Sequence, residues 1–268
     1  MSLKRKIAPG GLLSAWDWKC RFQRLGLPLR QAWKNAFSQE LKAAFVSCGV
    51  EHLPPKLRSR PMSVVDVGAN DGTWLASLSK FCCIEHGEAF EPNPESFERL
   101  RARFRGNTNI CLHRAAVGER PGTLMLKIMA STDFSSFLPV SSLVEKQYGH
   151  DAARVIYEVP VEVTTLDAAL TSLESIDLLK VDVQGFERSV FSGAYQTLKR
   201  TRAVLVEANL KSHYMGDDTL GSLYELLTKE HGLVFWDMSP PYRGRDGCAL
   251  WTDAIFLNET APPEHKAR

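Results

Sequence analysis

The sequence predicts an α/β fold in which helices cover both faces of a mostly parallel sheet. After residue 61, short apolar runs typical of strands alternate with stretches in which apolar residues recur at helical spacing. The runs 63–67 and 176–183 are mainly apolar, which is typical of strands buried on both faces. No apolar run reaches the 18 residues of a membrane span, so we expect none.

Strands and helices can be placed in order along this part of the chain. Strands are expected at 63–67, 88–91, 109–117, 157–165, 176–183, 203–208, 233–237 and 248–257. Helices are expected at 72–82, 94–104, 166–170, 185–199 and 220–231. The turn 118–122 and the alternating segment 123–129 indicate a β-hairpin after the third strand. Residues 130–143 are rich in serine and are expected to be irregular.

The first 60 residues differ from the rest in charge. They carry a net charge of +9 and the remainder −7, within a total of +2. Apolar residues recur at helical spacing in 14–25 and 29–50. We therefore predict a basic helical extension at 1–60, a main domain at 61–258 and a tail at 259–268. The interleaved aromatic and basic residues of the extension fit a membrane or glycolipid surface, or a cover over the sheet, which we favour.

The cysteines and the charge indicate the compartment and exclude some partners. Six cysteines show neither a CxxC pair nor the spacing of zinc ligands, and free thiols in a reducing cytosol explain them most simply. The basic start lacks the pattern of a secretory signal, so we expect a cytoplasmic protein, with peripheral membrane contact as an option. The main domain is acidic and has no recognised nucleic-acid motif, so no nucleic-acid partner is expected.

The loop Asp66–Gly72 joins the first strand of the main domain to a helix. Its glycines allow the backbone to approach a ligand closely, and the helix start offers unpaired N–H groups. Glu91 lies about twenty residues further on, at the end of the next strand, where a carboxylate can accept both hydroxyls of a ribose. The combination predicts a nucleotide-like ligand, with a purely structural turn as the alternative.

The residues of this loop favour S-adenosylmethionine (SAM) as that ligand. Dinucleotide sites use G-x-G-x-x-G, and the loop lacks the second glycine of that pattern. Asp66 would repel a diphosphate but suits a ligand that carries an ammonium and a sulfonium. An NAD-linked oxidoreductase is therefore the weaker interpretation. No G-x-x-x-x-G-K-[ST] sequence is present, so ATP bound through such a loop is not expected.

Polar residues also follow two later strands. Lys180, Asp182 and Gln184 lie at the end of the strand 176–183, where ligands of open α/β sheets bind. Lys180 lies within an apolar strand and needs a partner, which Asp182 or Glu187 can provide.

The next strand ends with Glu207 and Asn209, and His213 follows it. Asp182, Glu207 and Asn209 offer three oxygen ligands at adjacent strand ends, which leaves a Mg²⁺ site as a less favoured option.

Together these motifs resemble the FkbM-type methyltransferases. The resemblance rests on residues 66–72, 89–94, 165–167, 180–187 and 190–194 and on Glu207. It covers the main domain and implies a class I, Rossmann-like SAM-methyltransferase fold with a seven-stranded, mostly parallel sheet. The family mostly methylates hydroxyl oxygens of sugars and polyketide-type natural products, so the implied acceptor is a glycan or another small molecule. Gln184 stands where many relatives carry Glu.

Loop, strand-end and serine-pair residues make up the expected SAM site. The loop would hold the methionine part of SAM, Glu91 its ribose, and residues 92–93 and 114–116 its adenine. The full set is Asp66, Gly68, Ala69, Asn70, Gly72, Thr73, Glu91, Pro92, Asn93, Ala115, Ser136, Asp182 and Gln184. Ser136 belongs to a serine pair that the family also shows, and a structural turn is its alternative role.

Methyl transfer to a hydroxyl needs a positioned acceptor and a base that removes its proton. Asp182 is the first candidate for the base and His213 the second, with Lys180 beside Asp182. Asp182 could instead be only an ion-pair partner, and His213 a surface histidine. Two other functions stay open, namely a SAM-binding module without activity and transfer to nitrogen. The sequence 239–242 (S-P-P-Y) resembles a motif of amino-group methyltransferases, but it follows the sixth strand, so we interpret it as a loop.

Overall fold

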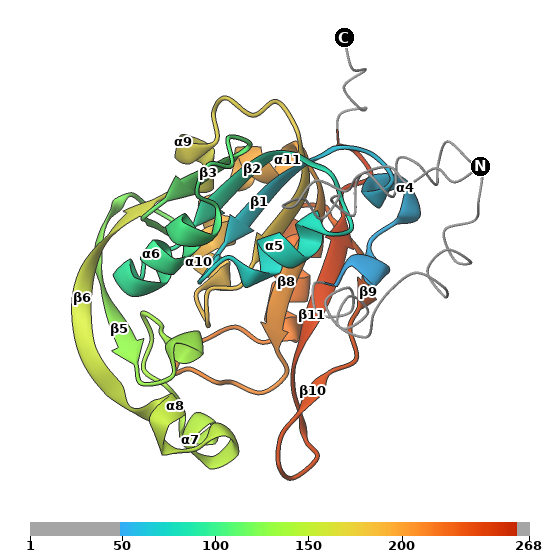
Figure 1. Ribbon diagram of the computed structural model, residues 1–268. Helices are drawn as coiled ribbons and strands as arrows, with labels where there is room; N and C mark the ends of the chain where they lie inside the picture. Colours follow the sequence, from blue (N-terminus) through green and yellow to red (C-terminus); the bar gives the residue numbers. More distant parts are fainter. Residues whose placement is uncertain (1–48, 262–268) are drawn as a thin grey trace, which may run out of the picture.

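A computed structural model describes residues 49–261 of the chain (Figure 1). The helices expected before residue 49, and with them most of the predicted basic extension, lie outside the described residues, as does the tail after residue 261.

The central sheet runs in the order β10-β11-β8-β7-β1-β2-β3, and β9 also pairs with β11. Its strands are β1 Met62–Val67, β2 Ile84–Phe90, β3 Ile110–His113, β7 Ile176–Val181, β8 Thr201–Asn209, β9 Val234–Met238, β10 Tyr242–Arg243 and β11 Ala249–Leu257. The five strands from β8 to β3 are parallel, and β11 is antiparallel to β8. This arrangement confirms the mostly parallel sheet that the sequence predicts.

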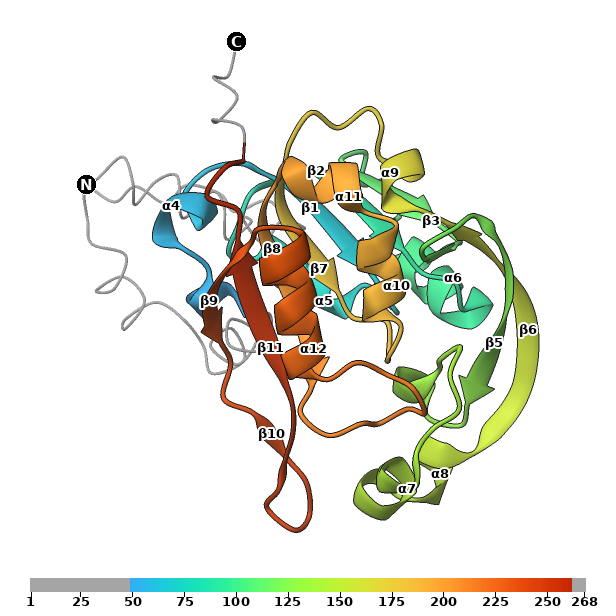
Figure 2. The ribbon, with the colours of Figure 1, turned by 180° about the vertical axis from the view of Figure 1, so that it is seen from behind.

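Helices cover both faces of this sheet. The helices of the described residues are η1 Val50–His52, α4 Pro55–Arg58, α5 Thr73–Ser79, α6 Pro94–Arg103, η2 Thr132–Phe134, α7 Ser142–Tyr148, α8 His150–Ala153, α9 Leu166–Ala169, α10 Glu187–Ser192, α11 Tyr195–Lys199, α12 Leu220–Glu225 and the π-helix η3 Leu226–Glu230. In Figure 1, α5 and α6 lie over one face, and in Figure 2, seen from behind, α10, α11 and α12 lie over the other.

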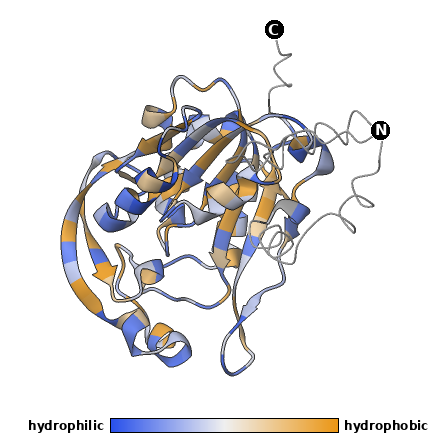
Figure 3. Cartoon of the chain, in the orientation of Figure 1, coloured by the Kyte–Doolittle hydropathy of each residue, from blue (hydrophilic) through white to orange (hydrophobic). Residues whose placement is uncertain are grey.

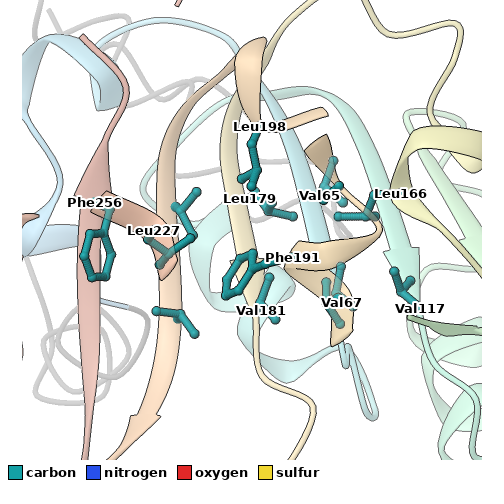
Figure 4. Packing of buried hydrophobic residues seen from close by; sticks show 14 of the residues in the cluster. Val65, Val67, Val117, Leu166, Leu179, Val181, Phe191, Leu198, Leu227 and Phe256 are labelled. Carbon is teal, nitrogen blue, oxygen red and sulfur yellow. The ribbon is translucent and has the colours of Figure 1, made fainter. Parts of the chain in front are cut away.

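Two apolar clusters hold these layers together. Val65 and Val67 of β1 pack with Phe191 of α10 on one face (Figure 4), while Val64 of the same strand packs with Leu75 of α5 on the other. Successive side chains of a strand point to opposite faces, so a strand covered on both faces must be apolar at nearly every position. The central strands are accordingly coloured mainly hydrophobic in Figure 3.

A second sheet of three strands curves away from the first one (Figure 1). It consists of β4 Ala116–Val117, β5 Gly122–Met129 and β6 Val155–Thr164, with its own apolar cluster around Leu126 and Val161. The segment expected at 123–129 is a strand, but its antiparallel partner is β6 rather than the strand before the turn. The strand expected at 109–117 is divided, because β3 pairs with β2 in the central sheet and β4 pairs with β6.

Other differences from the expected elements have local causes. The helix expected at 185–199 is two helices, α10 and α11, because the chain bends at Gly193. There a Cβ atom would overlap the carbonyl oxygen of Gly118. The helix expected at 220–231 is α12 followed by the π-helix η3. The helices α7 and α8 and the strand β10 were not expected, and each is short. Within residues 49–261, no helix is long and apolar enough to cross a membrane.

Candidate active site

A cavity of about 270 Å³ lies at the carboxyl ends of β1, β2, β7 and β8. Nine of the predicted cofactor residues line it: Gly68, Asn70, Glu91, Pro92, Asn93, Ala115, Ser136, Asp182 and Gln184. Asp66, Ala69, Gly72 and Thr73, also predicted, are not among the residues that line it. Twelve further residues line the cavity, and among them are Leu126, Asp133 and Glu207, which were not predicted to bind the cofactor. The cavity therefore lies between the loop Asp66–Gly72 and the ends of β7 and β8.

Glu91, directly after β2, is suited to a ribose. It is 6% exposed, and its two oxygens accept the backbone N–H groups of Asn70 and Asn93, each at 2.7 Å. A carboxylate accepts up to about four hydrogen bonds, so both oxygens retain capacity for the two hydroxyls of a ribose. Burial raises the pKa of Glu91 to about 7, against the lowering effect of its backbone hydrogen bonds. The residues present thus fit the ribose of SAM.

The loop glycines are required by packing against the protein itself. Gly68 has φ +82°, and a Cβ atom there would overlap the carbonyl oxygen of Asp182. Gly72 has φ +79°, and a Cβ atom there would lie 2.6 Å from the ring of Phe104. The loop therefore needs glycine to reach the end of β7 and the helix α6. Close approach of the loop backbone to a ligand stays a prediction, and Gly68 lines the cavity.

Lys180 is a buried cation that links this loop to Asp182. Its Nζ lies 3.3 Å from Asp66 Oδ1 and 3.1 Å from Asp182 Oδ2, and donates to the carbonyl oxygen of Gly68 at 3.2 Å. Burial opposes its charge, yet the carboxylates of Asp182 and Asp66 raise the pKa of Lys180. Lys180 therefore stays protonated and positions Asp182. The alternative partner, Glu187, instead accepts the backbone N–H groups of residues 183 and 185.

Gln184 lines the cavity and bridges two carboxylates. Its Nε2 donates to Asp182 Oδ1 at 2.9 Å and to Glu207 Oε1 at 3.1 Å. The Tyr214 hydroxyl donates to Gln184 Oε1 at 2.7 Å, which turns the amide nitrogen toward the carboxylates. Gln184 has φ +56°, and Ser136 Oγ donates to its carbonyl oxygen at 2.6 Å. This strained backbone is typical of a functional site.

His213, the second candidate for the base, does not line the cavity. It is 3% exposed, so it is not a surface histidine. Its Nε2 accepts the Tyr148 hydroxyl at 2.9 Å, and its Nδ1 donates to the carbonyl oxygen of Lys211 at 2.8 Å. Because both ring nitrogens are engaged, the structure gives no support to a role for His213 as the base.

The possible Mg²⁺ ligands are not arranged as a metal site. The Gln184 amide lies between Asp182 and Glu207, and the Asn209 amide donates to Asp217 at 3.0 Å. Among residues 49–261, no group of three or more His, Cys, Asp or Glu side chains could hold a metal ion.

Comparisons with known proteins identify the family. Residues 66–235 match the model of the methyltransferase FkbM domain. The 2-O-methyltransferase NoeI of Sinorhizobium fredii (strain NBRC 101917 / NGR234) is 26% identical over 198 residues, which cover 71% of this chain and 82% of that protein.

Two solved structures are also similar. A methyltransferase FkbM from Methylobacillus flagellatus KT is 17% identical with a TM-score of 0.48. The match covers 74% of this chain and 44% of that one, so this chain spans less than half of its length. Aeropyrum pernix fibrillarin with natively bound SAM is 13% identical with a TM-score of 0.45, over 80% of this chain and 73% of that one. Because the family model spans more than half of the sequence, this chain belongs to the FkbM-domain methyltransferases and is a SAM-dependent enzyme.

Proposed function

We propose that the enzyme transfers the methyl group of SAM to a hydroxyl oxygen of a sugar, a glycan or a related natural product. The observation that carries the proposal is that two carboxylates, Asp182 and Glu207, line the same cavity as Glu91. A sugar hydroxyl is a poor nucleophile, and a carboxylate within reach can remove its proton. The relative NoeI is named a 2-O-methyltransferase, which supports oxygen as the acceptor atom.

The two ends of the cavity have different tasks in this reaction. When bound, SAM supplies a methyl group on a positively charged sulfur. Glu91 and the backbone around Asn70 hold the ribose end, and the carboxylates of Asp182 and Glu207 provide negative charge near the other end. The protein then mainly has to bring the acceptor oxygen into line and take its proton.

Transfer to nitrogen receives less support. The S-P-P-Y sequence 239–242 follows β9 and ends at the first residue of β10, and none of its residues lines the cavity. The Ser239 hydroxyl contacts Thr252 and the backbone N–H of Asp253 instead, which secures the loop against β11. We therefore argue only the oxygen acceptor.

The experiment combines binding with product formation. Calorimetry with SAM measures cofactor binding, and release of S-adenosylhomocysteine measures turnover with a panel of methyl glycosides and oligosaccharides. We expect SAM to bind and at least one hydroxyl acceptor to be methylated. Binding without turnover on any acceptor would favour a SAM-binding module without activity. Failure to bind SAM, or turnover only with amines, would contradict the proposal.

A further inference from the structure

We infer that Glu207, rather than Asp182, is the general base, and that Gln184 and Tyr214 position it. The inference rests on the proposed transfer to a hydroxyl. It changes the expectation from the sequence, in which Asp182 was the first candidate and Glu207 a possible metal ligand.

Both oxygens of Asp182 already contact other side chains. Oδ2 lies 3.1 Å from the buried ammonium of Lys180, and Oδ1 accepts the Gln184 amide at 2.9 Å. A proton on Asp182 would remove a partner from a buried cation, which is costly. Oε1 of Glu207 accepts the same amide at 3.1 Å, and Oε2 makes no hydrogen bond to any residue that the structure describes. One oxygen of Glu207 is therefore available to an acceptor.

Glu207 lines the cavity at a distance from Glu91. The sheet order β2-β1-β7-β8 puts Glu91 and Glu207 three strand spacings apart, about 14 Å. With the ribose at Glu91, the opposite end of the cavity lies at β8. In this arrangement the acceptor approaches from the end of the cavity that is away from the ribose. Glu207 lies at that end, on β8, which is the neighbour of β11.

The charges around Glu207 also favour it as the base. Burial raises the pKa of Glu207 well above its ordinary value of 4.5, and the charges of Asp182, Asp253 and Glu187 raise it further, while Lys180 lowers it. Asp253 lies directly opposite Glu207 in the register of β8 and β11. The titratable and charged groups that face Glu207 are Asp182, Lys180, Glu187, Asp253, Tyr148 and Tyr214. A base whose pKa lies closer to the working pH accepts a proton more effectively.

Gln184 and Tyr214 act through Glu207 as positioning residues. Tyr214 is 1% exposed, and its hydroxyl fixes the Gln184 amide, so the amide nitrogen holds Oε1 of Glu207. This contact occupies Oε1 and leaves Oε2 available to a substrate. In the reaction, the acceptor oxygen bonds to the methyl carbon while the carbon–sulfur bond breaks and its electron pair stays on sulfur. The hydroxyl proton passes to Oε2 of Glu207 and then to solvent.

The test compares Glu207→Gln with the matched variant Asp182→Asn. Both remove one charge without changing side-chain size, and circular dichroism with thermal unfolding establishes that each is folded. The substrates are SAM and the methyl glycoside that the wild-type enzyme methylates best. We measure SAM affinity by calorimetry, and kcat and kcat/KM for the glycoside between pH 5 and pH 9 at saturating SAM, so that the titration of Glu91 at the ribose does not enter the profile.

We expect Glu207→Gln to bind SAM within about threefold of wild type and to lose about 10²- to 10⁴-fold in kcat. The decrease of kcat/KM at acidic pH should disappear in Glu207→Gln and persist in Asp182→Asn. If Glu207→Gln does not fold, Glu207→Asp replaces it; its carboxylate is one methylene further back, so kcat should fall while the acidic decrease persists.

Tyr214→Phe tests the positioning role. Without the hydroxyl, the amide no longer holds the charged form of Glu207, so the acidic decrease should move to higher pH while SAM affinity stays unchanged. A purely structural role would leave the pH profile in place.

Wild-type turnover in Glu207→Gln, or loss of the acidic decrease in Asp182→Asn alone, would overturn the inference and leave the proposed function intact. A wild-type enzyme that methylates no hydroxyl would overturn both.

Discussion

The carboxylate of Glu91 should make the affinity for SAM depend on pH. It is buried at the cavity and accepts two backbone N–H groups at 2.7 Å. Burial raises its pKa to about 7, so the group titrates in the range where binding is measured. The two hydroxyls of a ribose are donors, and only the ionised carboxylate accepts freely at both oxygens. We therefore expect the ionised form to bind SAM more tightly.

The direction follows from the raised pKa. Between its ordinary value of 4.5 and about 7, the folded protein holds a proton that the unfolded chain has lost. The contribution of Glu91 to stability is thus fully present below pH 4.5, the ordinary pKa of the group, and is lost as the pH rises through about 7, its pKa in the folded protein. SAM affinity changes in the opposite direction. The ionised fraction rises from about 0.1 at pH 6 to about 0.9 at pH 8, so the Kd for SAM should decrease about tenfold.

Calorimetry with SAM at pH 6 and pH 8 measures this change in the wild type, Glu91→Gln and Glu95→Gln. A glutamine has one acceptor oxygen, so its amide N–H₂ must face a backbone N–H group and one ribose hydroxyl loses its acceptor. These losses cost about 1.4–3 kcal/mol, which raises the Kd at pH 8 about 10- to 100-fold. The matched control, Glu95, is exposed on α6, and its carboxylate accepts the Tyr157 hydroxyl.

Glu91→Gln should also lose the tenfold dependence on pH, and any slope that remains measures titration of the amino group of the ligand. Glu95→Gln should keep both the affinity and the slope of the wild type. A wild-type Kd in Glu91→Gln, or an undiminished slope, would refute the placement of the ribose at Glu91.

The contacts around Gly68, Asp182 and Gln184 lead to further expected outcomes. Gly68→Ala forces a Cβ atom onto the Asp182 carbonyl, so urea unfolding should show a loss above about 2 kcal/mol. The control Gly106→Ala, with φ +80° and no described atom within 4 Å of its Cβ, should lose about 1–2 kcal/mol, and equal losses would contradict the packing argument. Asp182→Asn should lower kcat by more than it weakens SAM binding, and equal changes would remove its role near the acceptor. Gln184→Glu adds a third carboxylate, so the acidic decrease of kcat/KM should move to higher pH, and an unchanged profile would contradict the bridge. Chelation by EDTA should leave turnover unchanged, whereas a loss that Mg²⁺ restores would show a metal-dependent enzyme.

Residues that end a strand could be located from the sequence. Glu91 and Asp182 directly follow strands of the parallel part of the sheet, and Glu207 lies near the end of another, β8. Parallel strands end at one edge, so their places in the sequence were enough to predict that they face a common site. The fold could be predicted for the same reason, since strands buried on both faces leave a clear apolar pattern.

Residues in loops and in short helical turns such as η2 could not be located in this way. Tyr214 reaches Gln184 from 30 positions along the chain, and Asp133 reaches Asn70 across 63 positions. A loop has no periodic pattern to show where it leads, so neither contact has a signal in the sequence. The position of Asp253 opposite Glu207 depends on the register of an antiparallel pair, and the strand pattern alone does not fix that register.

The charges of the site divide into a fixed group and a free carboxylate. Lys180 lies between Asp66 and Asp182, and it also donates to the carbonyl oxygen of Gly68. Asp66 and Asp182 are therefore the two carboxylates that are paired with this cation. Glu207 makes no ion pair with any residue that the structure describes, although the charge of Lys180 lowers its pKa, so a proton on it leaves the contacts of Lys180 with Asp66 and Asp182 intact. Methyl transfer removes the positive charge from sulfur, and proton transfer to Glu207 removes a negative charge nearby. The net charge of the buried site then stays constant across the reaction, which matters because an uncompensated charge in such a site is costly.

Protonation of Asp182 would conserve the net charge equally well, but it would weaken the contacts by which Lys180 holds the loop Asp66–Gly72. The carboxylate that is free of Lys180 is for this reason the one suited to take the proton.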